Sequence, residues 1–137
     1  MHTEGTFLPE TAREARERYE ALGSTAQVVV KAVAKSMAFD SEEYDERVTS
    51  DVVETAREAM FGEALEVRVG TREAFDEWRE SADHEVEVVG ADNVDAVAWH
   101  APPFAEQAVA ATFQEEEAAA VATLRRQAVA RIYQDVV

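Results

Sequence analysis

The sequence contains no cysteine, only two lysines and only five glycines among 137 residues. The absence of cysteine excludes disulfide bonds, thiolate nucleophiles and zinc sites with cysteine ligands, and it fits a reducing cytoplasm. The glycines are too far apart to form a phosphate-binding loop. No serine lies in a nucleophile elbow, and no His-Glu-x-x-His pair is present. The common hydrolase and metalloprotease signatures are therefore missing.

Long apolar runs and basic tracts are also missing. No apolar stretch approaches the length of a membrane span, and residues 1–5 carry no basic region followed by an apolar core. We therefore expect a cytoplasmic protein that is neither exported nor inserted into a membrane. Because no basic tract alternates with aromatic residues, we expect no direct binding to nucleic acid.

What the chain does contain is negative charge. Aspartate and glutamate number 29 against 13 lysines and arginines, which gives a formal net charge of −16. Eleven of the cations are arginines, and the two lysines are Lys31 and Lys35. Such a surface is typical of proteins that work in molar salt, where the Debye length is only about 3 Å and repulsion between carboxylates is screened. The alternative is a surface that mimics nucleic acid or recruits a basic partner.

The N-terminal third has helical periodicity. Pro9 suits a first helical turn, and apolar residues then recur at steps of three and four as far as position 37. The phase survives Gly23, which favours one helix over residues 9–39; two helices joined at Gly23 are the alternative. Asp40 and Glu43 form a capping-box pattern that opens a second helix, closed by Gly62 and with a possible restart at Asp51.

After Gly62 the apolar period changes from 3.6 to 2. Residues 65–69 and 84–89 are predicted to be strands, and the helix predicted between them, residues 71–82, makes a parallel βαβ unit the natural arrangement. A third strand over residues 95–100 follows a loop rich in Gly, Asp and Asn, which predicts a hairpin.

Residues 104–136 can be written as a single alanine-rich helix that is apolar on most sides. Together, the elements predict a single α+β domain over residues 1–137. It consists of a helical hairpin, a small three-stranded mixed sheet in the order β-α-β-β, and a long C-terminal helix.

The whole chain is similar to small haloarchaeal proteins of unknown function. The resemblance rests on acidity, abundant Ala and Val, scarce Lys and the general run of the sequence. It carries no motif and implies no activity or cofactor. We expect an accessory or interaction protein that acts through assembly with itself or with a protein partner.

A metal-dependent enzyme, or a metal or pH sensor, is the alternative. A hairpin loop centred on Asp92 would place His84 opposite His100 at the edge of the sheet. Two imidazoles can bind a divalent metal if a carboxylate completes the site, and Glu117 lies near the apolar stripe of the predicted C-terminal helix. The alternative to a metal site is a structural role, with two unrelated histidines and a carboxylate paired with an arginine.

Helix lengths predict a homodimer. Helices over residues 9–39 and 104–136 would extend about 46 Å and nearly 50 Å, beyond the roughly 37 Å diameter of a compact domain of this size. Apolar residues near the projecting ends would then need cover from a second chain. The candidates for this interface are Tyr19, Leu22, Ile132 and Val136.

Overall fold

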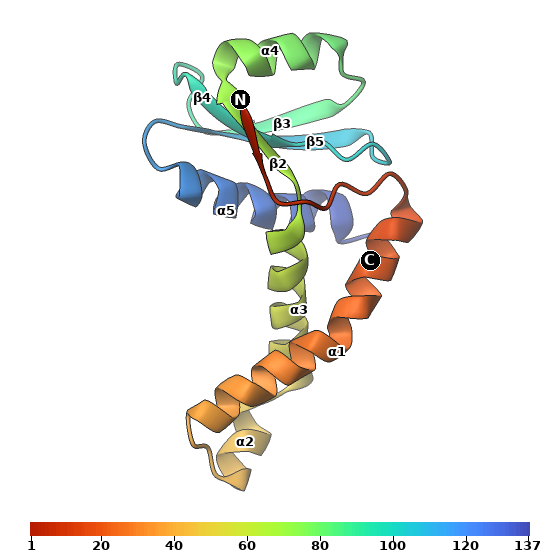
Figure 1. Ribbon diagram of the computed structural model, residues 1–137, viewed down its shortest axis with the longest axis vertical. Helices are drawn as coiled ribbons and strands as arrows, with labels where there is room; N and C mark the ends of the chain where they lie inside the picture. The colour runs from red at the N-terminus through yellow and green to blue at the C-terminus, as the bar shows by residue number, and fades with distance from the viewer.

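A computed structural model describes residues 1–137 (Figure 1). The helices are α1 (Ala12–Ser36), α2 (Ser41–Arg47), α3 (Ser50–Ala64), α4 (Arg72–Ser81) and α5 (Glu117–Ala128), which continues into a π-helical turn (Val129–Tyr133). The strands are β1 (His2–Glu4), β2 (Val67–Thr71), β3 (Glu85–Val89), β4 (Ala96–His100) and β5 (Gln107–Phe113). The predicted α+β class is confirmed, and no helix is both long enough and apolar enough to cross a membrane.

The five strands form one mixed sheet in the order β1-β2-β4-β5-β3. Helix α4 covers one face, and α5 covers the other (Figure 1). Strand β4 pairs antiparallel with both β2 and β5, whereas β3 pairs parallel with β5 at the edge. Strands β2 and β3 therefore run in the same direction, but the crossover through α4 passes over two strands between them.

The prediction of a three-stranded sheet is wrong, because the sequence of β5 lacks the apolar alternation that marks a strand. Four consecutive residues of this strand, Ala108 to Ala111, are buried. A strand covered on both faces has no apolar alternation, so a short alanine-rich run of this kind cannot be distinguished from helix by periodicity. The C-terminal helix consequently begins at Glu117 and not at residue 104.

The predicted hairpin between β3 and β4 is also wrong. Strand β4 instead forms an antiparallel pair with β5, with His100 opposite Val109 and Ala96 opposite Phe113. The proline-containing segment 101–106 is the connection that reverses the chain between these two strands.

Helix α1 is continuous through Gly23, as the unbroken apolar phase predicted. Its N-cap is Thr11, whose side chain accepts a hydrogen bond from the backbone N–H of Glu14. The second helix does break: Asp40 caps α2, and Thr49 caps α3 after the restart. Gly62 does not end α3 but lies buried within it.

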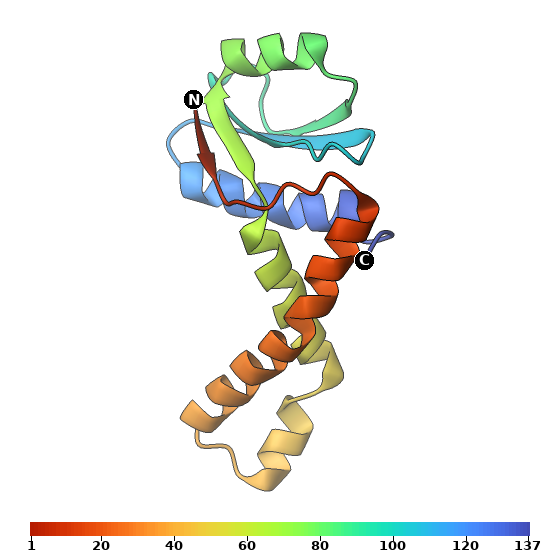
Figure 2. The same ribbon diagram turned by 45° about the vertical axis from the view of Figure 1, so that its right-hand side comes forward.

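The distal half of α1, α2 and the first half of α3 project from the three-layered body as an arm (Figure 2). The main core lies where the other ends of α1 and α3 meet α5 and the sheet. At its centre Phe61 is fully buried, with edge-on aromatic contacts to Phe7, Tyr19 and Tyr133 at ring-centroid distances of 5.0–5.8 Å. Such pairs add about 0.5–1.5 kcal/mol each beyond area burial, so this cluster joins the arm firmly to the body.

Candidate functional site

The two histidines predicted to face each other are not brought together. Because β3 and β4 do not pair, His84 precedes an edge strand and packs its ring against Trp78 in the α4 layer, with 6.1 Å between ring centroids. Its Nε2 donates to the backbone carbonyl of Pro102 at 2.9 Å. His100 lies in the opposite layer, beside Tyr133. The predicted opposition of His84 and His100 is therefore wrong.

His100 is held in one tautomer by its two neighbours. Its side chain is only 1% exposed, and Nδ1 lies 2.7 Å from the carbonyl oxygen of Glu66, which can only accept. Nε2 must then accept from the Tyr133 hydroxyl, also at 2.7 Å. Burial lowers the pKa of His100 to about 4, against the opposing effect of the Glu66 hydrogen bond, and burial raises the pKa of Tyr133. Both ring nitrogens are occupied, so the arrangement favours a structural role over metal binding.

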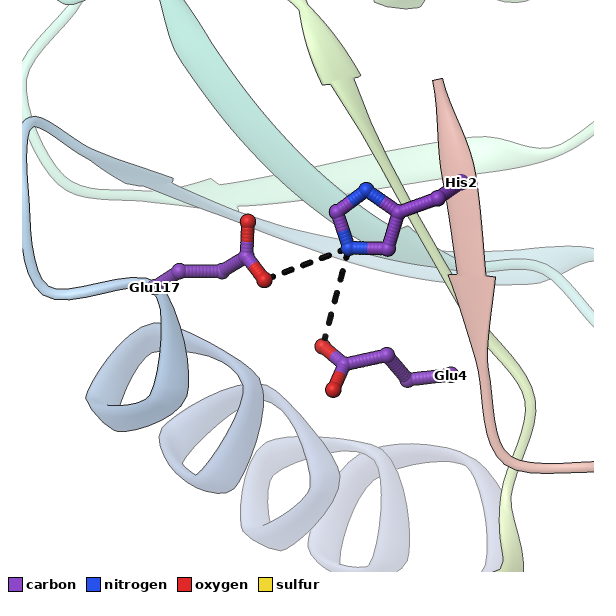
Figure 3. A group of neighbouring side chains, drawn as sticks. All are labelled: His2, Glu4 and Glu117. Carbon is purple, nitrogen blue, oxygen red and sulfur yellow. Dashed lines mark hydrogen bonds and ion pairs between the residues drawn. The ribbon is translucent and has the colours of Figure 1, made fainter.

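Glu117, the third predicted metal ligand, has a histidine partner, but a different one. Nε2 of His2 lies 3.2 Å from Oε2 of Glu117 and 4.0 Å from Oε2 of Glu4 (Figure 3). His2 and Glu4 are two residues apart on β1, so their side chains share a face of the strand. Glu117 is the first residue of α5. We name these three residues the His–Glu cluster.

Sequence reasoning missed His2 and Glu4 because residues 1–8 show no apolar periodicity. The segment nevertheless forms strand β1, which pairs antiparallel with β2 through three residues. The only local signal is the spacing of His2 and Glu4. That spacing becomes informative only once the segment is known to be extended.

Of the four residues predicted to form a dimer interface, two lie in the chain's own core and two pack against it. Tyr19 packs on Phe61 and donates a hydrogen bond to Glu54, and Ile132 is only 6% exposed. Leu22 and Val136 are partly buried against the same cluster. The C-terminal helix is too short to overhang the body, so this surface does not need a second chain to cover it.

A different apolar surface does lack cover. Four large apolar residues in the distal half of α1 and at its C-cap are exposed, with values of 66% for Val28 and 53% for Val33. We name them the arm stripe: Val28, Val29, Val33 and Met37. Segment 21–39, which contains it, carries no aspartate or glutamate but both lysines of the chain. Both lysines are exposed, and neither forms an ion pair.

A cleft of about 630 Å³ lies between α3 and the C-terminal helix. Its charged groups largely serve the fold: Arg125 donates to the carbonyl oxygen of Leu65 and lies 3.6 Å from Glu63. Arg57 lies 3.5 Å from Glu54. Neither group with a strongly shifted pKa lines the cleft, so the usual mark of a catalytic site is missing there.

Comparison with known proteins gives a family but no activity. No curated protein and no solved structure matches the chain. The model of a family of unknown function, DUF5809, matches residues 6–134. The chain therefore belongs to the DUF5809 family.

Proposed function

We propose that the protein is an interaction protein that assembles with a second copy of itself through the arm stripe. The observation that carries the proposal is the exposure of Val28, Val29, Val33 and Met37 along one helix. Val29, Val33 and Met37 follow one another at intervals of four residues and therefore form a row along α1. Contiguous exposed apolar surface of this kind marks interaction sites more often than chance exposure of single residues does.

Charge favours a second copy over an unrelated partner. The segment that carries the arm stripe has two free lysines and no acid, whereas α2 in the same arm carries Glu42, Glu43, Asp45 and Glu46. A two-fold axis brings the same surface of both chains together. Because Lys31, Lys35 and α2 all lie at the tip of the arm (Figure 2), a two-fold interface centred there would bring the lysines of one chain near the acidic α2 of the other, with the apolar rows in contact.

Salt decides which of these forces is stronger. At molar ionic strength the Debye length is about 3 Å, so the apolar row supplies the affinity and the charges mainly fix the orientation. In dilute salt the net charge of −16 on each chain opposes association. We therefore expect a homodimer that becomes tighter as salt is raised.

The setting that fits this proposal is a salt-rich archaeal cytoplasm. The acidity, the replacement of lysine by arginine and the absence of cysteine all support it. No activity or cofactor is needed for the proposed role, which is to present or hold together the bodies attached to the two arms.

The test is the mass in solution at molar salt, measured by light scattering over micromolar concentrations. The unmodified chain should have twice the mass of one chain, and Val33→Glu should have the mass of one. Ala119→Glu adds the same charge to an exposed position on α5, outside the arm, and should remain dimeric. An unmodified protein that stays monomeric, or a Val33→Glu variant that stays dimeric, would refute the proposal.

A further inference from the structure

We propose that the His–Glu cluster binds one divalent transition-metal ion, with Zn²⁺ as its simplest occupant. The three side chains come from β1 and the start of α5, more than one hundred residues apart in sequence, and the fold brings them together (Figure 3). The cluster lies on β1 and α5 in the body of the protein, whereas the arm stripe lies in the distal half of α1 and at its C-cap, in the arm (Figure 1). This proposal therefore does not depend on the proposed assembly.

The spacing of the ligand atoms suits a metal. One ring nitrogen of His2 and one oxygen each from Glu4 and Glu117 all lie within 4.8 Å of one another. Tetrahedral zinc with bonds of about 2.0–2.2 Å separates its ligand atoms by roughly 3.4 Å. The distances of 3.2 Å and 4.0 Å from Nε2 of His2 lie on either side of that value, so small side-chain rotations would be sufficient.

A second observation concerns the environment of Glu4. Its Oε2 is shielded from solvent and has no hydrogen-bond partner within the protein, although the Glu4 side chain as a whole is 44% exposed. A shielded carboxylate oxygen without a donor carries a desolvation cost, which a bound cation would offset. It points toward Nε2 of His2 (Figure 3). A cation bound between these side chains would be coordinated by Oε2 of Glu4, by Nε2 of His2 and by the carboxylate of Glu117.

The donor set indicates which metals fit. An imidazole nitrogen favours Zn²⁺ and the neighbouring first-row ions, whereas Mg²⁺ and Ca²⁺ prefer sites made of oxygen alone. The side chains of His2 and Glu117 are 52% and 40% exposed, which gives the ion a path from solvent. Three protein ligands would leave the fourth position to water.

The bound ion would connect two layers of the fold. Strand β1 lies at the edge of the sheet and is held by a ladder of only three residue pairs. Glu117 begins the helix that covers the sheet. A metal shared by the two elements would hold β1 against the sheet and α5, so we expect zinc to raise the thermal stability of the protein.

The competing explanation is an ion pair between a protonated His2 and the two carboxylates, without metal. The two explanations respond oppositely to protons, because a metal needs a neutral imidazole whereas the ion pair needs a charged one. Zinc affinity should accordingly fall as the pH is lowered. An ion pair alone predicts no specific zinc binding at any pH.

The experiment is calorimetric titration of the untagged full chain with Zn²⁺, together with Co²⁺ absorption to report the ligands. We expect one ion per chain. Loss of a residue that only hydrogen-bonds to a metal ligand already weakens metal binding about 10–100-fold. Loss of a direct ligand should cost at least as much, so His2→Ala, Glu4→Gln and Glu117→Gln should each weaken zinc binding by at least about tenfold. Glu116→Gln is the matched control, because Glu116 is exposed beside the cluster and outside it; it should bind like the unmodified protein.

Thermal unfolding with and without Zn²⁺ separates binding from folding. Zinc should raise the melting temperature of the unmodified protein and of Glu116→Gln but not of the three ligand variants. If the unmodified protein binds no zinc, or if the ligand variants bind and respond as Glu116→Gln does, the metal site is refuted. Either result leaves the mass of the protein at molar salt, and hence the assembly proposal, untouched.

Discussion

The hydroxyl of Tyr133 donates a 2.7 Å hydrogen bond to Nε2 of His100 within the closed interior of the protein. Through this bond the C-terminal π-helical turn is attached to the end of β4, and Nδ1 of the same imidazole attaches β4 to the segment that precedes β2. A buried network is costly when one partner is missing. His100 is therefore a junction between three parts of the chain.

This junction predicts that stability falls in mildly acidic solution. Burial lowers the pKa of folded His100 to about 4, whereas an unfolded histidine titrates near 6.5. Neutral, buried His100 therefore makes its full contribution to the free energy of unfolding above pH 6.5. That contribution is lost as the pH falls toward 4, because over this range only the unfolded chain gains the proton. At about 1.4 kcal/mol per unit, the loss is roughly 3 kcal/mol.

The measurement is chemical unfolding at molar salt over this pH range, compared with His100→Asn. The asparagine amide can replace Nδ1–H as the donor to Glu66 but cannot titrate. Protonation of other groups is common to both proteins, so the difference between their free energies of unfolding is the quantity of interest. If the unfolding free energies of the unmodified protein and His100→Asn differ by the same amount at pH 7 and at pH 4, His100 is not buried in its neutral form.

A second prediction concerns salt. The formal net charge of −16 sits on 137 residues, and the Debye length grows from about 3 Å at 1 M salt to about 30 Å at 10 mM. Repulsion among the carboxylates should therefore lower the melting temperature in dilute salt, by about 3–4 °C for each kcal/mol lost. The measurement is thermal unfolding followed by circular dichroism across this range of salt.

A charge-reduced variant serves as the control. Asp76, Glu77 and Glu80 lie close together in α4, outside the arm, and are exposed. Their replacement by Asn, Gln and Gln should make the melting temperature less dependent on salt. A melting temperature that is the same in dilute and molar salt would show that the acidic surface does not set the stability.

The parts of the fold that the sequence predicted are those with a visible period or cap. The unbroken phase of α1, the cap at Asp40 and the alternation of Val67 and Val69 about Arg68 are all local features, and each appears where it was expected. Strand β5 has no such signal, because helices cover both of its faces and alanine fills its core positions. With β5 assigned to helix, the strands over residues 84–89 and 95–100 are consecutive and joined by a turn-like loop, which favours the wrong hairpin over the observed pairing of β4 with β2 and β5.

The candidate site was harder to predict because it depends on which distant segments meet. Glu117 was singled out for lying near an apolar face, yet its partners come from the first strand. Nothing near His2 indicates where β1 will pair. The arm stripe failed to stand out for a related reason: Val29 and Val33 follow the same helical phase as buried residues such as Ala26. Only the divergence of α1 from the body leaves them exposed.

The last prediction uses Gly23 to test whether α1 is continuous in solution. Gly5 and Gly90 are the only glycines with positive φ, so Gly23 has a backbone that alanine can adopt. A Cβ at Gly23 would lie 3.6 Å from Cζ of Arg57, an ordinary contact. Because glycine within a helix costs about 0.5–1 kcal/mol relative to alanine, Gly23→Ala should stabilise the protein by that amount, seen as a higher urea midpoint with an unchanged slope.

Gly5→Ala is the contrasting variant, since φ at Gly5 is +83° and its Cβ would collide with the carbonyl of Leu65; it should destabilise the protein. If Gly23→Ala also destabilises, α1 is not continuous in solution: a glycine that ends one helix and starts another adopts the left-handed conformation that alanine disfavours.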